Sequence, residues 1–127
     1  MQELNLHDNN ATIEVLAPVR ATATANGTGI DMRDYIGKMK FILSSSAGGG
    51  TTPTLDVKLQ ECDTSGGTYT DISGATFTQV TDAADSTEDL GLAIDGVKRY
   101  VRAVETITGT SPTFDRALLA IGRKQVV

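Results

Sequence analysis

The chain of 127 residues is predicted to be all-β: a single-domain β-sandwich of about eight antiparallel strands with an N-terminal arm. Gly, Ser and Thr make up 38 of its residues, and Thr favours strands whereas Gly and Ser favour turns. Short stretches of alternating apolar and polar residues recur, with turn signals about every 8–15 residues. No stretch has the period of an amphipathic helix. This pattern leaves a jelly-roll and an immunoglobulin-like strand order open.

The expected strands follow one another from residue 13 onwards. Each is a run of alternating or apolar residues bounded by Gly, Pro, Asn, Asp or Ser. The runs are residues 13–17, 30–35, 38–45, 55–60, 69–72, 75–80, 90–94, 97–106 and 113–123. Pro18 ends the first run or places it at a sheet edge, because proline has no N–H for strand pairing. The last run is apolar enough to suggest burial on both faces.

Alternation is clearest in the runs 38–45 and 55–60. The residues expected to face the core are Met39, Phe41 and Leu43 in the first run and Leu55, Val57 and Leu59 in the second. The connections are predicted from turn chemistry. Residues 44–53 are expected to form a long flexible loop, residues 81–89 an acidic loop, and Asp95-Gly96 a hairpin turn.

The length fits one domain, and we assign residues 1–12 to the arm and residues 13–127 to the sandwich. The arm is Asn-rich and lacks periodicity. Residues 1–16 could add a strand to the sheet edge of a neighbouring molecule. A domain of this size buries roughly two-thirds of its unfolded surface, so it needs no metal or disulfide to fold. Cys62 is the only cysteine, which excludes a disulfide within the chain.

A short motif occurs twice, 59 residues apart. The sequence GTTPTLD at 50–56 is matched by GTSPTFD at 109–115. Glycine frees the backbone and proline fixes φ, so each copy predicts a turn that leads into a strand. Both copies could simply be good turns. Alternatively, two similar loops lie at one end of a sandwich built from two related halves, and they touch a partner. The candidate interface residues here are Thr51, Thr52, Pro53, Thr110, Ser111 and Pro112.

Basic residues gather near the C-terminus. Six of the eleven lie there: Lys98, Arg99, Arg102, Arg116, Arg123 and Lys124. If strands 97–106 and 113–123 pair, these residues form one basic patch on a chain whose net charge is −5. Such a patch would suit an acidic partner or a second copy of the chain, and a mixed solvated face is the alternative. Lys98, Arg99 and Arg102 complete the candidate interface.

Composition argues against enzymatic chemistry. His7 is the only histidine, so one chain cannot build a multi-histidine metal site, and we expect no catalytic, cofactor-binding or metal-binding residues. The glycines at 48–50 lack the Lys-Ser/Thr ending of a phosphate-binding loop. The acidic residues at 82–89 do not have the spacing of a calcium loop. A pI near 4.7 disfavours nucleic acid, and no apolar run or signal-peptide pattern indicates a membrane or export.

Several segments occur in an order that is informative together. They are IDMRDY at 30–35, SSSAG at 44–48, PTLDVKLQE at 53–61, KRYVRA at 98–103 and TGTSPTF at 108–114. From Gly29 to the C-terminus, the chain resembles a family of small structural proteins of tailed phages and prophages. Similar proteins are β-sandwich virion components, and some are head decoration (cement) proteins. The resemblance supplies no catalytic residues.

The resemblance implies a capsid decoration protein that is made in the bacterial cytoplasm and binds the outside of the assembled phage head. Its partners would be the major capsid protein and further copies of itself, with a trimer favoured, and no cofactor, nucleic acid or membrane. Head–tail joining or tail components are the alternative within the virion. A carbohydrate-binding module is a further alternative, weakened because such sites use exposed aromatic rings and the chain has three Tyr, three Phe and no Trp.

Overall fold

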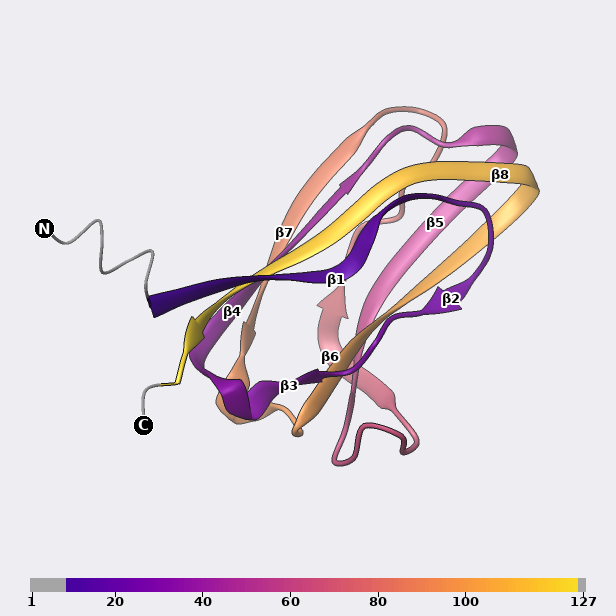
Figure 1. Ribbon diagram of the computed structural model, residues 1–127. Helices are drawn as coiled ribbons and strands as arrows, with labels where there is room; N and C mark the ends of the chain where they lie inside the picture. Colours follow the sequence, from indigo (N-terminus) through magenta and orange to yellow (C-terminus); the bar gives the residue numbers. More distant parts are fainter. Residues whose placement is uncertain (1–8, 126–127) are drawn as a thin grey trace, which may run out of the picture.

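Eight strands and two short 3₁₀ helices make up the computed structural model, which describes residues 9–125 (Figure 1). The strands are β1 (Asn10–Ala21), β2 (Ala25–Asn26), β3 (Ile30–Asp31), β4 (Tyr35–Ser45), β5 (Gly49–Cys62), β6 (Thr70–Thr76), β7 (Ser86–Ala93) and β8 (Tyr100–Lys124). The 3₁₀ helices are η1 (Met32–Asp34) and η2 (Ile94–Gly96). The predicted all-β sandwich is therefore confirmed. Within residues 9–125, no helix has the length and apolar character to cross a membrane.

Strand β8 belongs to both layers of the sandwich. Its residues 100–108 pair with β5 on one side and with β2 and β3 on the other. Its residues 113–124 pair with β1 and β4. β6 extends the layer of β5, and β7 extends the layer of β4. The strand orders, β1-β8-β4-β7 and β2/β3-β8-β5-β6, are those of a jelly roll, which decides between the two topologies left open by the sequence.

The prediction of two separate strands at 97–106 and 113–123 is wrong. β8 is continuous and bends over near residues 109–112, at the upper right of Figure 1. Its two halves lie in different layers and do not pair with each other, so the condition for a single basic patch is not met. Burial on both faces of 113–123 is also wrong. Buried and more accessible residues alternate there, because only one face meets the core.

Two predicted loops are shorter than expected. Only three residues connect β4 to β5, because the glycine-rich segment pairs with β8 through Gly49↔Thr113 and Thr51↔Thr110. The acidic loop ends early, since β7 begins at Ser86 and the consecutive residues Glu88 and Asp89 lie within this strand.

Three smaller predictions also differ from the structure. The runs 69–72 and 75–80 were expected as two strands, but a single strand, β6, spans residues 70–76 and passes through Gly74 at φ +79°. Residues 94–96 form η2 where a hairpin turn was expected. Segment 30–35 is divided between β3, η1 and the first residue of β4. At each of these places a turn-like backbone conformation interrupts the alternation of apolar and polar residues on which the prediction was based.

The core lies between the layers and contains both faces predicted from alternation. The members of these faces are at most 1% exposed: Met39, Phe41, Leu43, Leu55, Val57 and Leu59. Among the described strands, β1 pairs with β8 alone and so forms a sheet edge. Pro18 lies within that edge strand, between the pairs Leu16↔Leu118 and Val19↔Arg116, where the register shifts. The edge position predicted for this proline is confirmed.

The expected arm falls partly inside β1. Residues 1–8 lie outside the described residues, whereas residues 10–12 pair with residues 121–123 of β8. Residues 10–16 therefore supply an edge strand to their own sheet. The expected addition of residues 1–16 to a neighbour's sheet stays a prediction, because β1 is paired on one side by β8 and residues 1–8 lie outside the described residues.

The two halves of the chain repeat one arrangement. In each half, two edge segments precede a 3₁₀ turn, and two long strands follow that are joined by a sharp corner. The pair Ala21↔Phe114 has its counterpart, 59 residues away, in the bridge Leu55↔Val80. Both 3₁₀ turns also close with a bond to the carbonyl three residues back, from Tyr35 in η1 and from Val97 in η2. This arrangement agrees with the interpretation of the sandwich as two related halves.

A buried ion pair joins the two halves of β8 across the core. Arg116 Nε and Nη2 donate to the Glu105 carboxylate at 2.6 and 2.5 Å, and Arg116 Nη1 donates to the Ala17 carbonyl at 2.6 Å. Glu105 is 1% exposed and Arg116 is 8% exposed. Placing Arg116 in a surface basic patch is therefore wrong. Both residues alternate in phase with core residues of β8, a signal present in the sequence.

Removing one partner of this pair should destabilise the fold strongly. Glu105→Ala leaves the Arg116 charge buried without its counter-charge, which costs about 3–5 kcal/mol of unfolding free energy. Replacing both with Leu and Met should recover most of that loss, because no charge is then buried. Urea unfolding measures both variants. Arg20→Ala, which breaks the exposed pair with Asp115, is the control and should change stability little. A Glu105→Ala variant as stable as this control would contradict the account.

Candidate partner interface

The two copies of the repeated motif meet at one corner of the sandwich. They pair with each other through Gly49↔Thr113, Thr51↔Thr110 and Thr54↔Thr108. Adding 59 to residues 49 and 54 gives 108 and 113, so the first and third pairs are equivalent. The middle pair joins two equivalent threonines. A local two-fold axis therefore passes between Thr51 and Thr110, and we call residues 50–53 and 109–112 the paired corner.

Two glycines allow the copies to approach closely. Gly50 has φ +97° and Gly109 has φ +120°, a region that favours glycine. A Cβ at Gly109 would come within 2.9 Å of main-chain atoms of Thr51, Thr52 and Pro53. A Cβ at Gly50 would come within 2.6 Å of the Thr110 carbonyl oxygen. Each copy thus depends on the glycine of the other.

Two further residues of the paired corner adopt an uncommon backbone conformation. Thr52 has φ 47° and Ser111 has φ 49°, and they occupy equivalent positions of the motif. A positive φ is unfavourable for residues with a side chain, particularly β-branched ones such as threonine. Such conformations persist when the surroundings enforce them, and they cluster at functional sites. Thr52 and Ser111 thus give this exposed corner two equivalent residues with a positive φ. Of the interface candidates that the sequence indicated, the paired corner is the strongest.

The structure divides the nominated corner residues by exposure. Thr51, Thr52, Thr110 and Ser111 are exposed, Pro112 is half-buried and Pro53 is buried. Pro53 lies beneath Gly48, where an added Cβ would come within 2.8 Å of the proline ring. The accessible part of the paired corner therefore presents hydroxyl and main-chain groups and carries no charged side chain.

The basic residues of the predicted interface lie far from this corner. Arg102 and Thr110 are eight residues apart on β8, which corresponds to about 26 Å along an extended strand. Lys98 and Arg99 lie further still, just before β8 begins. The nominated residues therefore form two groups at opposite ends of the sandwich.

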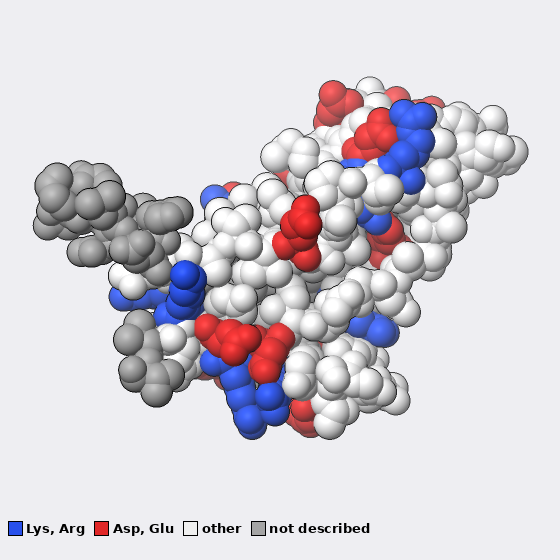
Figure 2. All heavy atoms as spheres, viewed as in Figure 1, with Lys and Arg blue, Asp and Glu red and all other residues white. Residues whose placement is uncertain are grey.

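Arg99 and Arg102 already have partners within the domain. Arg99 donates to both carboxylate oxygens of Asp31 at 3.2 and 2.9 Å, and these hydrogen bonds lower the pKa of Asp31. Arg102 donates twice to Gln60 Oε1 and lies 4.2 Å from the centre of the Tyr69 ring. Acidic and basic atoms lie side by side at the lower edge in Figure 2. Such a mixed surface attracts an acidic partner less than an isolated basic patch would.

Two acidic side chains near or within β7 accept hydrogen bonds from main-chain amides. Asp85 accepts from the Ala47 amide at 2.8 Å, and Glu88 accepts from the Thr78 amide at 3.0 Å. Across the part of the chain that the structure describes, no group of His, Cys, Asp and Glu side chains is arranged to hold a metal ion. His7 lies outside that part.

Aromatic rings are mostly covered. All three phenylalanines are buried. The ring of Tyr69 lies against Arg102, and the ring of Tyr100 lies 5.0 Å from the Arg99 guanidinium. Carbohydrate sites usually stack sugars on free aromatic faces. The described surface does not offer a flat, uncovered row of such rings.

Comparison with known proteins shows the fold. No family model and no curated protein matches the chain. Among solved structures, it is similar to the infectious bursal disease virus VP2 of a subviral particle, with a TM-score of 0.55 and 11% identity over 91% of this chain and 32% of that one. It spans about a third of that capsid protein. The SPBc2 prophage-derived protein YomS has a TM-score of 0.52 and 10% identity, over 90% of this chain and 92% of that one. A CBM4 structure has a TM-score of 0.50 and 21% identity, over 91% of this chain and 71% of that one.

Substituting the glycine of the second motif tests the paired corner. Gly109→Ala combines a positive φ with a close approach to the backbone of Thr51, Thr52 and Pro53, so it should lower the unfolding free energy by about 1–3 kcal/mol. Gly66→Ala is the matched control, since a Cβ at that glycine meets open space. Chemical denaturation of both variants gives the comparison. Equal stability of the two would show that the corner does not need its glycine.

Proposed function

We propose that the chain is a structural virion protein, a capsid decoration protein that binds the outside of an assembled phage head and stabilises it. The observation that carries the proposal is the jelly-roll sandwich. A prophage-derived protein shares it over about nine-tenths of both chains, and viral capsid proteins share it over part of theirs. The family resemblance of the segments from residue 29 onwards supports the same role.

The described surface supports a binding role better than a chemical one. Residues 9–125 offer no metal-binding cluster, and each of their buried side-chain nitrogen and oxygen atoms has a hydrogen-bond partner. The paired corner instead provides an uncharged surface whose two copies pair with each other and expose Thr51, Thr52, Thr110 and Ser111. We assign the contact with the major capsid protein to this corner, through the exposed hydroxyl and main-chain groups of Thr51, Thr52, Thr110 and Ser111.

Decoration requires binding alone and no catalytic residues. A protein that binds the assembled shell and not free subunits stabilises the shell by mass action. Weak individual contacts suffice when the decoration protein is an oligomer, because further contacts then form at high effective concentration.

Two other functions are compatible with a β-sandwich. A head–tail joining or tail component would also be a virion protein, but it would occupy the neck or tail. A carbohydrate-binding module is represented among the similar structures. The arginines that lie against Tyr69 and Tyr100 and the burial of all three phenylalanines argue against it. Selective binding on a glycan array would favour that module over the virion role.

Variants of the paired corner test the proposed capsid contact. We expect Thr51→Arg combined with Thr110→Arg to weaken binding to phage particles assembled without this protein by about tenfold or more, because two bulky charges enter the interface. Thr70→Arg with Thr76→Arg is the matched control, since both threonines are exposed on β6, the edge strand next to β5. Co-sedimentation measures the dissociation constants, and circular dichroism checks the fold. Wild-type binding by the corner variant would rule out this contact.

A further inference from the structure

The outward side of the layer β1-β8-β4-β7, here called the outer face, has an apolar centre. Leu119 lies directly opposite Ile42 of β4, with Ala117 and Ile121 two residues to either side on β8. Ile121 is 40% exposed, and the other three are partly accessible. Contiguous apolar surface of this kind marks interaction sites in soluble proteins.

The other layer is polar at the equivalent positions. The motif offset of 59 relates Ala117 and Leu119 of β8 to Lys58 and Gln60 of β5. Asp71 accepts from Lys58 Nζ at 2.9 Å and from Gln60 Nε2 at 2.8 Å, and Gln60 also accepts from Arg102. The same strand positions are therefore fully compatible with polar residues. Neither the core nor strand pairing requires the apolar character of the outer face.

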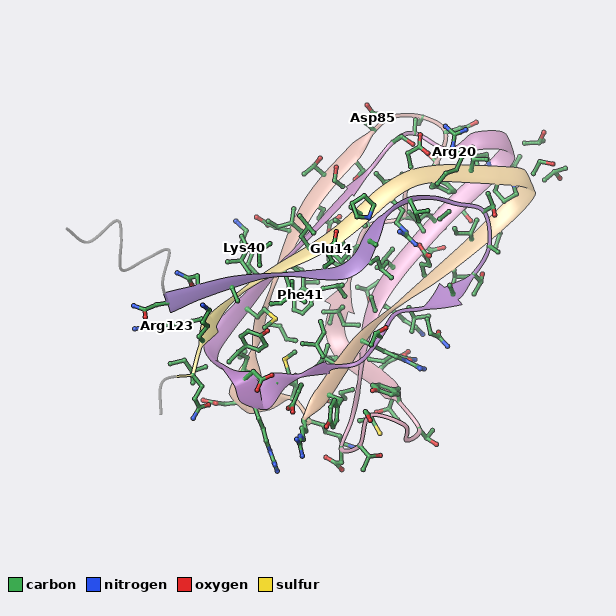
Figure 3. The ribbon with its side chains drawn as sticks, viewed as in Figure 1. Glu14, Arg20, Lys40, Phe41, Asp85 and Arg123 are labelled. Carbon is green, nitrogen blue, oxygen red and sulfur yellow. The ribbon has the colours of Figure 1, made fainter. Side chains whose placement is uncertain are left out.

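Charged residues flank the apolar centre in an ordered way. Lys38, Lys40 and Arg123 lie towards the end of the sandwich that carries the chain termini. Glu14 and Asp89 lie level with Leu119, one step nearer the paired corner. Figure 3 shows Arg123, Lys40 and Glu14 in that order along the strands. Lys40 Nζ forms an ion pair with Asp89 at 3.0 Å across the line between Ile121 and Leu119. The other charged residues named here are Lys38 and Arg123 on one side of this line and Glu14 on the other.

We propose that the outer face binds the outer face of a second copy of this chain. A two-fold axis that runs across the strands between Ile121 and Leu119 brings Ile121 of each copy near Leu119 of the other. The same axis sets Lys38 and Arg123 of each copy against the side of the other copy that carries Glu14. The contact is isologous, so it is self-complementary and closes at two copies.

The shape of the outer face suits this contact. Gly91 has no side chain opposite Lys40, and a shallow hollow lined by Lys40, Gly91 and Ile121 results. This hollow can receive an aliphatic side chain from the facing sheet, since packed sheets interdigitate their side chains. A trimer, which the family resemblance favours, would need head-to-tail contacts between different surfaces. The placement of Glu14 on one side of the apolar centre and of Lys38 and Arg123 on the other favours the two-fold contact.

The oligomeric state of the purified full-length chain tests the proposal without any phage particle, so its failure is distinguishable from failure of the virion role. We expect sedimentation velocity to give twice the 13.4 kDa chain mass at micromolar concentration. Ile121→Asp should weaken association by about tenfold or more, because it buries a charge at the centre. Val104→Asp is the matched control. Val104 lies on β8 in the other layer, half-buried and opposite Lys58.

Charge variants test the orientation of the two copies. Lys38→Glu with Lys40→Glu makes the outer face acidic, and Glu14→Lys with Asp89→Lys makes it basic. Each double variant should self-associate less than the wild-type chain, and an equimolar mixture should form a heterodimer. A wild-type monomer or trimer, an Ile121→Asp variant that associates like the wild-type chain, or a mixture that stays monomeric would overturn the proposal.

Discussion

Strand β8 holds the two layers together, and the buried pair Glu105–Arg116 is the interaction on which that depends. The strand crosses from one layer to the other at the paired corner, so each half lines a different side of the core. The pair joins the two halves across the interior and also binds the carbonyl of Ala17 in β1. Three segments that are distant in the sequence are thereby fixed relative to one another. Both candidate surfaces depend on this arrangement.

The sequence predicted what depends on local pattern. Alternation placed Phe41 and Leu55 in the core, and the absence of helical periodicity gave the all-β fold. The local pattern did not predict the continuity of β8, because the glycine and proline in segment 109–112 are typical of a loop. In the structure this segment pairs with the equivalent segment of β5. Arg116 was assigned to the surface because it is charged, although it lies in phase with the buried residues Phe114 and Leu118. Strand order depends on long-range pairing, which local patterns do not encode.

The candidate interface was predictable only in part. The repeated motif correctly indicated two related turns, and the structure shows that they pair and share an unusual backbone conformation. Lys98, Arg99 and Arg102 were grouped with the turns by residue type, although they lie at the opposite end. The apolar outer face was missed since its residues are ordinary members of strands 38–45 and 113–123. Only the layer order shows that Leu119 and Ile42 are neighbours that point away from the core.

The proposed function leads to a particle with two kinds of contact, one between the paired corner and the shell and one between copies of the chain. The copy number in purified particles tests the central claim most directly. Quantitative mass spectrometry of particles from the encoding phage or prophage gives the molar ratio of this chain to the major capsid protein. A decoration protein should be present at a ratio of the same order as the capsid subunit. A few copies per particle, or none, would contradict the account.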